Sequence, residues 1–448
     1  MPPASDTEQP APRFWQRYFA RRIVYPRELP SIMRKHIYTG VMGSVYFTLV
    51  TGIFFLYFGT AIGMSRFQWG LMGGVSSFLL SAQLLGALIT RRLGHRKFLW
   101  LVCALAHRTL LLVGILLAFV IWQAGWPGAG AVLIVFVCVG NFLGAMASPP
   151  WLSWLADIIP EKDHGGFWGR RSAWIALSIV AVVIPAGLLF DMVPETAKLP
   201  LTVIVFGLAT LVGVIDLFIH GTIPEPSMEV GVRNHFLQHL LTPLRDRSFR
   251  PWLAFNGCWT FGMTLGGSLA MLYFLEELGI KRNFLGGMIV LTSLPLVGGM
   301  LTGRWSGRLV DRLGSRRVLQ VGHVCWSILP LLWIAAAPGW SALILLGCSS
   351  LIGGTSSTAA INAATKLITR TPPPSERAMY AAVSACLGSL AAGLGVLTAG
   401  AVLKHMGDWQ TVIAGKTVVA FHLLFVGSFC IRLLSAVLLI PHVREPGG

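Results

Sequence analysis

The chain has 448 residues, of which 54% are hydrophobic and only 12% are charged. Soluble globular proteins carry about 25% charged residues, so this composition excludes an ordinary soluble domain and indicates a protein that lies in lipid. The net charge of +17 would also suit nucleic-acid binding, but the Lys and Arg residues gather in loops between apolar segments, which is typical of membrane topology.

The first 37 residues form a basic, proline-rich segment that includes Arg13, Arg17, Arg21 and Arg22. A signal peptide would place a short apolar core after a brief basic region and would end at small residues, and neither feature is present. We therefore expect residues 1–37 to be a cytoplasmic tail.

Apolar segments of about twenty residues or more follow, the length that a helix needs to cross roughly 30 Å of hydrocarbon at 1.5 Å per residue. Their glycine content and 3.6-residue periodicity favour helices over the alternating strands of an outer-membrane barrel. We predict twelve transmembrane spans, at residues 38–62, 67–90, 98–122, 129–156, 171–193, 199–222, 251–276, 284–303, 317–337, 340–368, 377–403 and 414–441.

Most of the 35 Lys and Arg residues lie in the two tails and in the loops on the same side as the N-terminus. Because basic loops face the cytoplasm in membrane proteins, we expect a multi-pass protein of a bacterial-type inner membrane with both termini cytoplasmic. Its surroundings are then a lipid bilayer, and nucleic acid is not an expected partner.

A single long interruption separates the sixth and seventh predicted spans, and apolar residues recur within it at helical spacing. This pattern predicts an amphipathic helix at the inner membrane interface. The predicted domains are a tail (1–37), a first six-helix bundle (38–223), a linker (224–250), a second six-helix bundle (251–441) and a tail (442–448). The apolar positions of the linker helix are Phe236, Leu237, Leu240, Leu241 and Leu244.

The two halves of the chain resemble each other at an offset of roughly 215–220 residues. The basic turn at 93–97 returns at 313–317, and the segments that follow the fourth and sixth spans return after the tenth and twelfth. We therefore predict an all-α membrane protein whose twelve transmembrane helices form two pseudo-symmetric six-helix bundles.

The turn after the eighth span is similar to the signature loop of the major facilitator superfamily, Gly-x-Leu-x-Asp-Arg-x-Gly-x-Arg-Arg/Lys. The first-half copy, aligned on Gly94, has Arg91 at the acidic position and Ala87 at the leading glycine, and so departs from the pattern. In this family the charge cluster of the loop is thought to latch the outward-open state. The resemblance therefore implies a gating loop that includes Gly307, Leu309, Asp311, Arg312, Gly314, Arg316 and Arg317.

The resemblance also implies secondary active or facilitative transport of a small solute, by alternating access through a central cavity. It places helices 1, 4, 7 and 10 around that cavity. Amides on these helices are costly in hydrocarbon unless paired, and aromatic rings offer flat faces with a polar edge. Ordinary hydrogen bonding and packing between helices is the alternative role for each. The candidates for solute contact are Tyr46, Tyr57, Asn141, Asn256, Trp259 and Asn362.

Three charged residues lie well inside predicted spans, where an unpaired charge costs about 2.5–3.5 kcal/mol. They are Arg108, Asp216 and Arg432. We expect Arg108 and Asp216 to pair within the first bundle. Because no intramembrane acid lies in its own half, Arg432 is expected to reach backbone carbonyls, lipid phosphate or the inner interface.

Proton coupling needs a titratable group that changes exposure during the cycle. The candidates Asp216, His107, His323 and His422 fall on predicted outer helices, where packing is the favoured role. A uniporter or a symporter for a neutral or anionic solute stays open, with a proton or sodium ion as a further partner of a symporter.

The seven cysteines all fall within predicted spans and none forms a Cys-x-x-Cys pair. Motifs of zinc hydrolases, serine hydrolases and phosphate-binding loops are absent from the sequence, so we expect no enzyme activity, no metal and no cofactor. The alternative function is a membrane sensor or scaffold with the transporter fold but no transport. Such a protein would usually need an additional soluble domain for its output.

Overall fold

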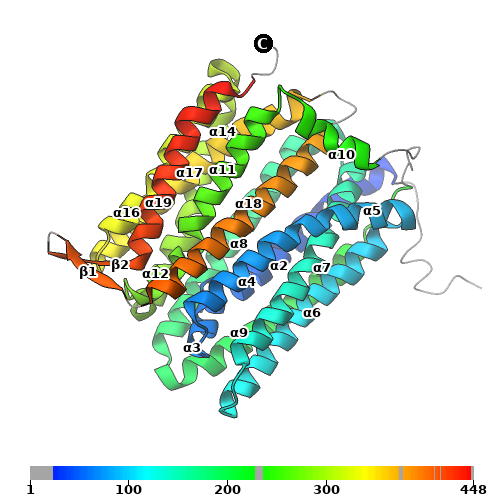
Figure 1. Cartoon of the computed structure of the whole chain (residues 1–448). Coiled ribbons are helices and arrows are strands. Elements are labelled where there is room, and N and C mark those ends of the chain that lie inside the picture. The colour runs from blue at the N-terminus through cyan, green and yellow to red at the C-terminus, as the bar shows by residue number, and fades with distance from the viewer. Residues whose placement is uncertain (1–23, 228–235, 373–376, 408, 414, 445–448) are drawn as a thin grey trace, which may run out of the picture.

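The computed structural model describes residues 24–227, 236–372, 377–407, 409–413 and 415–444. Long helices run roughly side by side through the molecule (Figure 1). Twelve of the described helical segments are long and apolar enough to cross a membrane, which confirms the predicted number of spans.

The first half of the chain contributes six spans, two of which are built from consecutive helices. Gly52 separates α2 from α3, and Ser65 begins α4 by accepting a hydrogen bond from the Gln68 amide. In chain order the helices are α2 (Leu29–Thr51), α3 (Ile53–Ala61), α4 (Arg66–Leu79), α5 (Gln83–Leu93), α6 (Arg96–Gln123), α7 (Ala129–Ile158), α8 (Glu161–Met192) and α9 (Glu195–Gly221).

The second half repeats the arrangement after the linker helix α10 (Phe236–Arg245), which was predicted from the sequence. Its helices are α11 (Arg250–Gly267), α12 (Ala270–Glu276), α13 (Phe284–Met288), α14 (Leu294–Leu313), α15 (Ser315–Ser327), α16 (Leu329–Ala335), α17 (Trp340–Arg370), α18 (Arg377–Met406) and α19 (Ala420–Leu434). Short 3-10 and π turns join or extend several of them: η1 (Pro26–Glu28), η2 (Leu80–Ala82), η3 (Ile280–Arg282), η4 (Ile289–Ser293), η5 (Ser435–Leu439) and η6 (Ile440–His442).

Four predicted boundaries differ from the structure by six residues or more. Helix α8 begins ten residues before the predicted position 171, and α14 ends ten residues after the predicted position 303. The first helix begins at Leu29, nine residues before the predicted position 38, so part of the expected tail is helical. The last span was predicted from residue 414, but its helix begins at Ala420, and strands β1 (Gln410–Ile413) and β2 (Lys416–Val419) form an antiparallel hairpin in front of it. The strands are rich in β-branched residues, and Gly415 supplies a φ of +78° at the turn.

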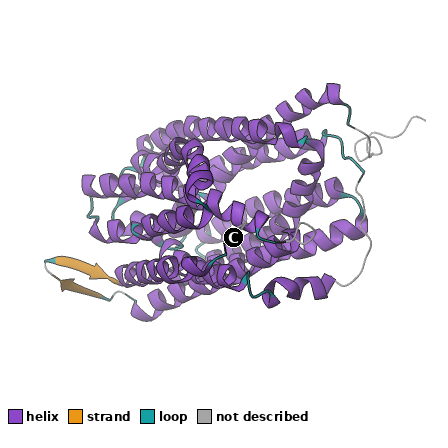
Figure 2. Cartoon of the chain, turned by 90° about the horizontal axis from the view of Figure 1, so that it is seen from above, coloured by secondary structure: helices purple, strands orange, loops and turns teal. Residues whose placement is uncertain are grey.

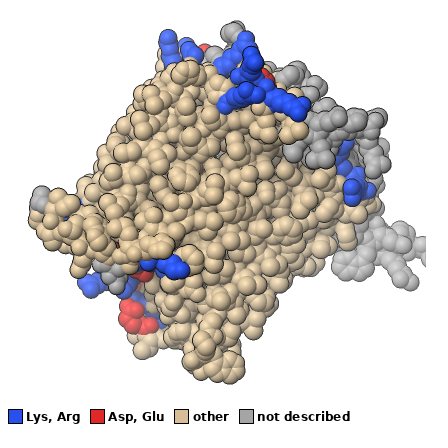
Figure 3. Space-filling view, viewed as in Figure 1, with Lys and Arg blue, Asp and Glu red and all other residues tan. Residues whose placement is uncertain are grey.

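Charged side chains gather at the two ends of the molecule and leave a broad uncharged band between them (Figure 3). We call the end that carries α10 the linker end and the end that carries β1 and β2 the hairpin end (Figure 1). Such a band suits the hydrocarbon core of a bilayer, and the chain is a multi-pass membrane protein.

The two halves pack closely between α4 and α18. A Cβ atom placed on Gly70 would lie 2.5 Å from the Cα atom of Gly400, so the two backbones touch where the residues are smallest. Seen from above, helices make up nearly all of the molecule, and the two strands project at one side (Figure 2).

Polar contacts join the halves at the hairpin end. Arg66 lies 3.6 Å from Glu276 and 3.1 Å from Glu277. Asp191 accepts hydrogen bonds from the backbone amides of Phe284 and Leu285, each at 3.0 Å. The hairpin end is therefore closed.

Candidate functional site

A cavity of about 630 Å³ opens among the helices of the first half. Its walls are parts of α2, α4, η2, α5, α6, α7, α8 and α9, and most of the lining residues of α6, α8 and α9 lie in the half of the helix nearer the linker end. A second cavity of about 340 Å³ shares Ser76 and Asn141 with the first and extends to Leu269 and Leu272 of the second half. Together the two cavities lead from the linker end toward the contact between the halves.

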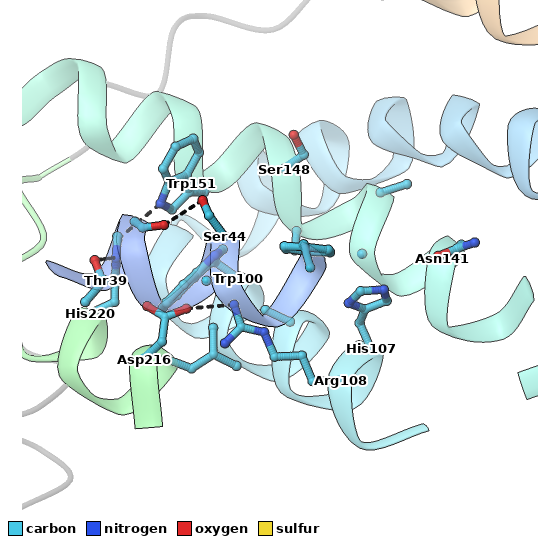
Figure 4. Close-up of a pocket in the computed structure, with 18 of the residues that line it drawn as sticks. Thr39, Ser44, Trp100, His107, Arg108, Asn141, Ser148, Trp151, Asp216 and His220 are labelled. Atoms are coloured by element: carbon cyan, nitrogen blue, oxygen red, sulfur yellow. Dashed lines mark hydrogen bonds and ion pairs between the residues drawn. The ribbon is translucent and has the colours of Figure 1, made fainter. Parts of the chain in front are cut away.

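A buried ion pair lies in the wall of the first cavity. Arg108 on α6 places its Nη2 atom 2.7 Å from Oδ2 of Asp216 on α9, and the two residues are only 6% and 5% exposed. The guanidinium also lies 4.9 Å from the ring centre of Tyr46 on α2. The predicted pairing of Arg108 with Asp216 is confirmed, and Figure 4 shows the two side chains pointing toward one another.

Arg171 on α8 brings a second guanidinium to the same cavity. It lies 5.6 Å from the ring centre of Trp151 and 5.4 Å from that of Trp168, so two indole faces hold it. Within the described part of the chain its Nε atom has no hydrogen-bond partner. The neighbouring Arg170 is exposed instead, which sets the two adjacent arginines apart.

His220 on α9 is held by hydrogen bonds from two other helices. The indole Nε1 of Trp151 donates to its Nε2 atom at 3.2 Å, and its Nδ1 atom lies 2.9 Å from the hydroxyl of Thr39 (Figure 4). An indole nitrogen only donates, so Nε2 must be unprotonated and Nδ1 must carry the proton that reaches Thr39. This arrangement keeps His220 neutral.

Three glycines make room for the charged cluster. A Cβ on Gly40 would lie 2.7 Å from Arg171 Nε, and one on Gly43 would lie 3.0 Å from Asp216 Oδ2. A Cβ on Gly213 would lie 3.2 Å from Arg108 Nη1. Helices α2 and α9 therefore lack side chains where the two guanidiniums and the carboxylate approach them.

The first-half candidates for solute contact fall in three different places. Asn141 lines both cavities and donates a 2.9 Å hydrogen bond to the hydroxyl of Ser76. Tyr46 is fully buried beside Arg108, and its hydroxyl has no hydrogen-bond partner among the described residues. Tyr57 packs toward the hairpin end, 4.8 Å from the ring centre of Phe190. Only Asn141 of these three is in a cavity wall.

The second-half candidates lie outside both cavities. Asn256 donates to the carbonyl of Ser384 at 2.9 Å, and Asn362 donates to the hydroxyl of Ser306 at 2.7 Å. These are the hydrogen bonds between helices that the sequence left open as the alternative role. A role for either residue in solute contact stays a prediction.

Arg432 on α19 is buried without an acidic partner among the described residues, and aromatic rings take the place of one. Its guanidinium lies 4.8 Å from the ring centre of Trp259 and 5.9 Å from that of Trp326. It also donates a hydrogen bond to the backbone carbonyl of Trp326. The expectation that Arg432 would reach a backbone carbonyl is confirmed.

The predicted gating loop is exposed at the linker end. Asp311 pairs with Lys366 at 2.9 Å, and Arg316 donates to the carbonyl of Pro441 at 3.2 Å. Gly314 has a φ of +86° at the turn, and both Arg312 and Arg317 face outward. Gly307 has open space at its Cβ position. The gating role of these residues stays a prediction.

The first-half counterpart of that loop forms a tighter cluster, although its sequence departs from the family pattern. Arg96 is fully buried, pairs with Asp157, and lies 3.8 Å from the buried carboxylate of Glu225. Lys97 donates to the carbonyl of Ile223 at 3.2 Å. This cluster ties the end of α7 and the segment after α9 to the start of α6.

Comparisons with known proteins find a similarity to one family over the second half of the chain. The family model of the Major Facilitator Superfamily matches residues 291–446. A curated relative, "Probable anion transporter 3, chloroplastic" of Arabidopsis thaliana, is 33% identical over 142 residues, which is 31% of this chain and 26% of the relative. The match thus spans about a quarter of that relative's length. No cluster of three His, Cys, Asp or Glu residues that could hold a metal occurs in the described ranges.

Solved structures share the fold over nearly the whole chain. The inward open conformation of the xylose transporter XylE from E. coli matches with a TM-score of 0.67 and 14% identity, covering 94% of this chain and 97% of that one. The nucleoside transporter NupG matches with a TM-score of 0.64 and 12% identity, covering 93% and 99%. A bacterial homologue of the iron transporter ferroportin matches with a TM-score of 0.64 and 16% identity, covering 94% and 100%.

Proposed function

We propose that this chain is a member of the Major Facilitator Superfamily and that it carries a small solute across a membrane by alternating access; its fold and the family model matched in its second half support the proposal. The observation that supports this most directly is the pair of joined cavities, which runs from the linker end to the contact between the two halves. The solute passes unchanged, as in transport rather than catalysis.

The contacts between the halves favour one state of the transport cycle. Arg66 and Asp191 hold the halves together at the hairpin end, while the larger cavity lies toward the linker end. Opening the other way requires these contacts to break and the halves to rock about the contact between α4 and α18.

The orientation in the membrane follows from the charge distribution. Loops and tails rich in Lys and Arg lie on the side of the linker and both termini. We infer that this side is cytoplasmic and that the membrane is a bacterial-type inner membrane. The state described above is then inward-facing.

Uptake into liposomes that contain only this protein tests the proposal. The solutes to be tested include neutral ones, such as xylose and a nucleoside, and several anions. The anions are chosen because the Arabidopsis relative is named as a probable anion transporter. We expect saturable uptake of at least one solute. Uptake that persists when the proton and sodium gradients are collapsed indicates a uniporter, and its loss indicates a coupling ion.

Two glycine variants test the mechanism of transport, one at a contact between helices and one, as its control, away from any such contact. Gly70→Val puts a side chain where α4 and α18 touch and should abolish uptake, because the hairpin end can no longer close. Gly207→Val introduces the same side chain on α9, where nothing lies within 4 Å of the added Cβ, and should transport normally. If no solute moves faster than in protein-free liposomes, the sensor or scaffold reading replaces transport.

A further inference from the structure

The geometry points to a small oxyanion of single negative charge, such as a monocarboxylate, as the ligand of the first-half cavity, with Arg171 and Arg108 as the groups that bind it. This inference rests on the proposed transport function and names the class of solute. It comes from the charges, the unused donors and the room in the cavity wall.

The charges of the cavity wall do not cancel. Arg108 and Arg171 carry two positive charges, and Asp216 supplies one negative charge. His220 is neutral because it accepts from Trp151, which leaves a net charge of +1. A net charge held away from bulk water is costly unless a partner neutralises it, and one monovalent anion would do so.

Two further histidines lie near the pair without supplying a negative charge. His36 on α2 stands edge-on to His220, with ring centres 4.5 Å apart, and its nitrogens have no partner within the residues the structure covers. His107 on α6 lines the cavity and stacks on Phe47. Protonation of either ring would make the wall more positive and so would strengthen its preference for an anion.

Each guanidinium lines the cavity and keeps one buried donor atom without a hydrogen-bond partner in the described structure. Asp216 takes one hydrogen bond, from Arg108 Nη2, and leaves Nη1 of the same side chain without a partner in the described structure. Arg171 Nε is likewise unpaired there. A guanidinium presents its donors in a planar fork that matches the oxygens of a carboxylate or phosphate.

The two cations face the same stretch of α2. Gly40 adjoins Arg171. Gly43, less than one helical turn further along, adjoins Asp216, and a Cβ atom added to Gly43 would lie 3.5 Å from Arg108 Nη2. Both guanidiniums therefore border one region of the cavity. The indole faces of Trp151 and Trp168 hold Arg171 in place before a ligand arrives, which reduces the entropy lost on binding.

A neutral sugar or nucleoside fits this wall less well. Such solutes donate as well as accept hydrogen bonds, and the wall offers them neutral acceptors such as Gln83 and Asn141, but they carry no charge to neutralise the arginines. The carboxylate of Asp216 is already engaged by Arg108, whereas the unused groups of the two arginines are all donors. The wall is built for a ligand rich in acceptors.

Thermal unfolding of the purified full-length protein with lactate, sulfate and xylose tests the inference. We expect lactate to raise the unfolding temperature in a saturable way and xylose to leave it unchanged, since a ligand at a hundred times its dissociation constant stabilises by about 2.7 kcal/mol. Arg171→Gln should weaken lactate binding at least about tenfold, and Arg171→Lys should restore part of it.

The adjacent arginine gives a matched control. Arg170→Gln removes the same charge from an exposed side chain and should bind lactate as the unaltered protein does. Asp216→Asn keeps an oxygen that can accept from Arg108 but raises the net charge of the wall to about +2, so it should shift the preference from lactate toward sulfate. Equal effects of Arg170→Gln and Arg171→Gln, or saturable stabilisation by xylose alone, would overturn the inference.

The binding and uptake measurements separate this inference from the proposed function. Lactate binding that depends on Arg171, without uptake of any solute into liposomes, would refute transport and leave the anion site standing. Uptake of a neutral solute, with no stabilisation by either anion, would support transport and refute the anion site.

Discussion

Each half of the molecule has a buried arginine well inside a membrane span, and the two halves satisfy its charge in different ways. Arg108 in the first half pairs with a carboxylate at 2.7 Å, whereas Arg432 in the second half lies against two indole rings and donates to a backbone carbonyl. Asp216 and Arg432 are 216 residues apart, so an acid and a base occupy similar places in the two repeats. The two halves therefore share their order of helices but not the charges that those helices carry.

The difference separates an arginine in a cavity wall from one that is enclosed by aromatic rings. The pair in the first half borders a cavity and leaves guanidinium donors unused. Around Arg432, the ring of Trp259 packs edge-on against His323, with centres 4.3 Å apart, and the residues that line the two cavities do not include this cluster. This contrast agrees with the anion site proposed for the first half.

The largest expected effect comes from removing the acid of the first half. Asp216→Ala leaves Arg108 buried and unpaired, and it should lower the free energy of unfolding by about 3–5 kcal/mol. Arg432→Met removes a buried charge together with its cation–π contacts, and the change should stay within about 1–2 kcal/mol. Chemical unfolding of both variants in the same detergent measures the contrast.

A double variant checks the cause of that effect. Arg108→Met combined with Asp216→Ala removes both charges, and it should recover part of the stability that Asp216→Ala loses, since no unpaired charge then stays buried. If the two single changes simply add, the ion pair is not what distinguishes the first half.

A second contrast lies at the linker end. Arg96→Met leaves the buried Glu225 and the half-exposed Asp157 without their partner. It should lower the free energy of unfolding by about 3 kcal/mol. Lys366→Met affects an exposed pair with Asp311 and should change stability by less than about 1 kcal/mol. The same unfolding experiment compares them, and a larger loss from Lys366→Met would reverse the ranking of the two clusters.

Much of the fold follows from the sequence because hydrophobic length is a strong signal in a membrane protein. All twelve spans and the linker helix were predicted, and so was the pairing of Arg108 with Asp216, since two isolated opposite charges in one bundle have few alternatives. The hairpin before α19 was missed because its second strand ends in Val418 and Val419, which run directly into the apolar span that follows.

The rest of the site depends on the direction in which each side chain points, which the sequence pattern does not show. Arg170 and Arg171 both look like basic residues at the inner end of a span, and only the packing of α8 against α7 turns Arg171 onto Trp151. His220 was missed because it lies near the end of its span, where a polar residue is ordinary. The small residues Gly40 and Gly43 on α2 were the available signal that bulky side chains from other helices approach there.

The smallest effect that still tests the comparison comes from adding one methyl group to each half. Gly40→Ala places its Cβ 2.7 Å from Arg171 Nε, the far end of a flexible side chain, so the guanidinium moves while the helix stays intact. Lactate affinity should fall about tenfold, or about 1.4 kcal/mol, with little change in unfolding. Gly257→Ala adds the same methyl to α11, the corresponding first helix of the second half, where nothing lies within 4 Å. The Gly257→Ala variant should bind lactate normally, because a methyl group there displaces no side chain that contacts the anion. A comparable loss of lactate affinity in both variants would place the site between the two halves rather than within the first half.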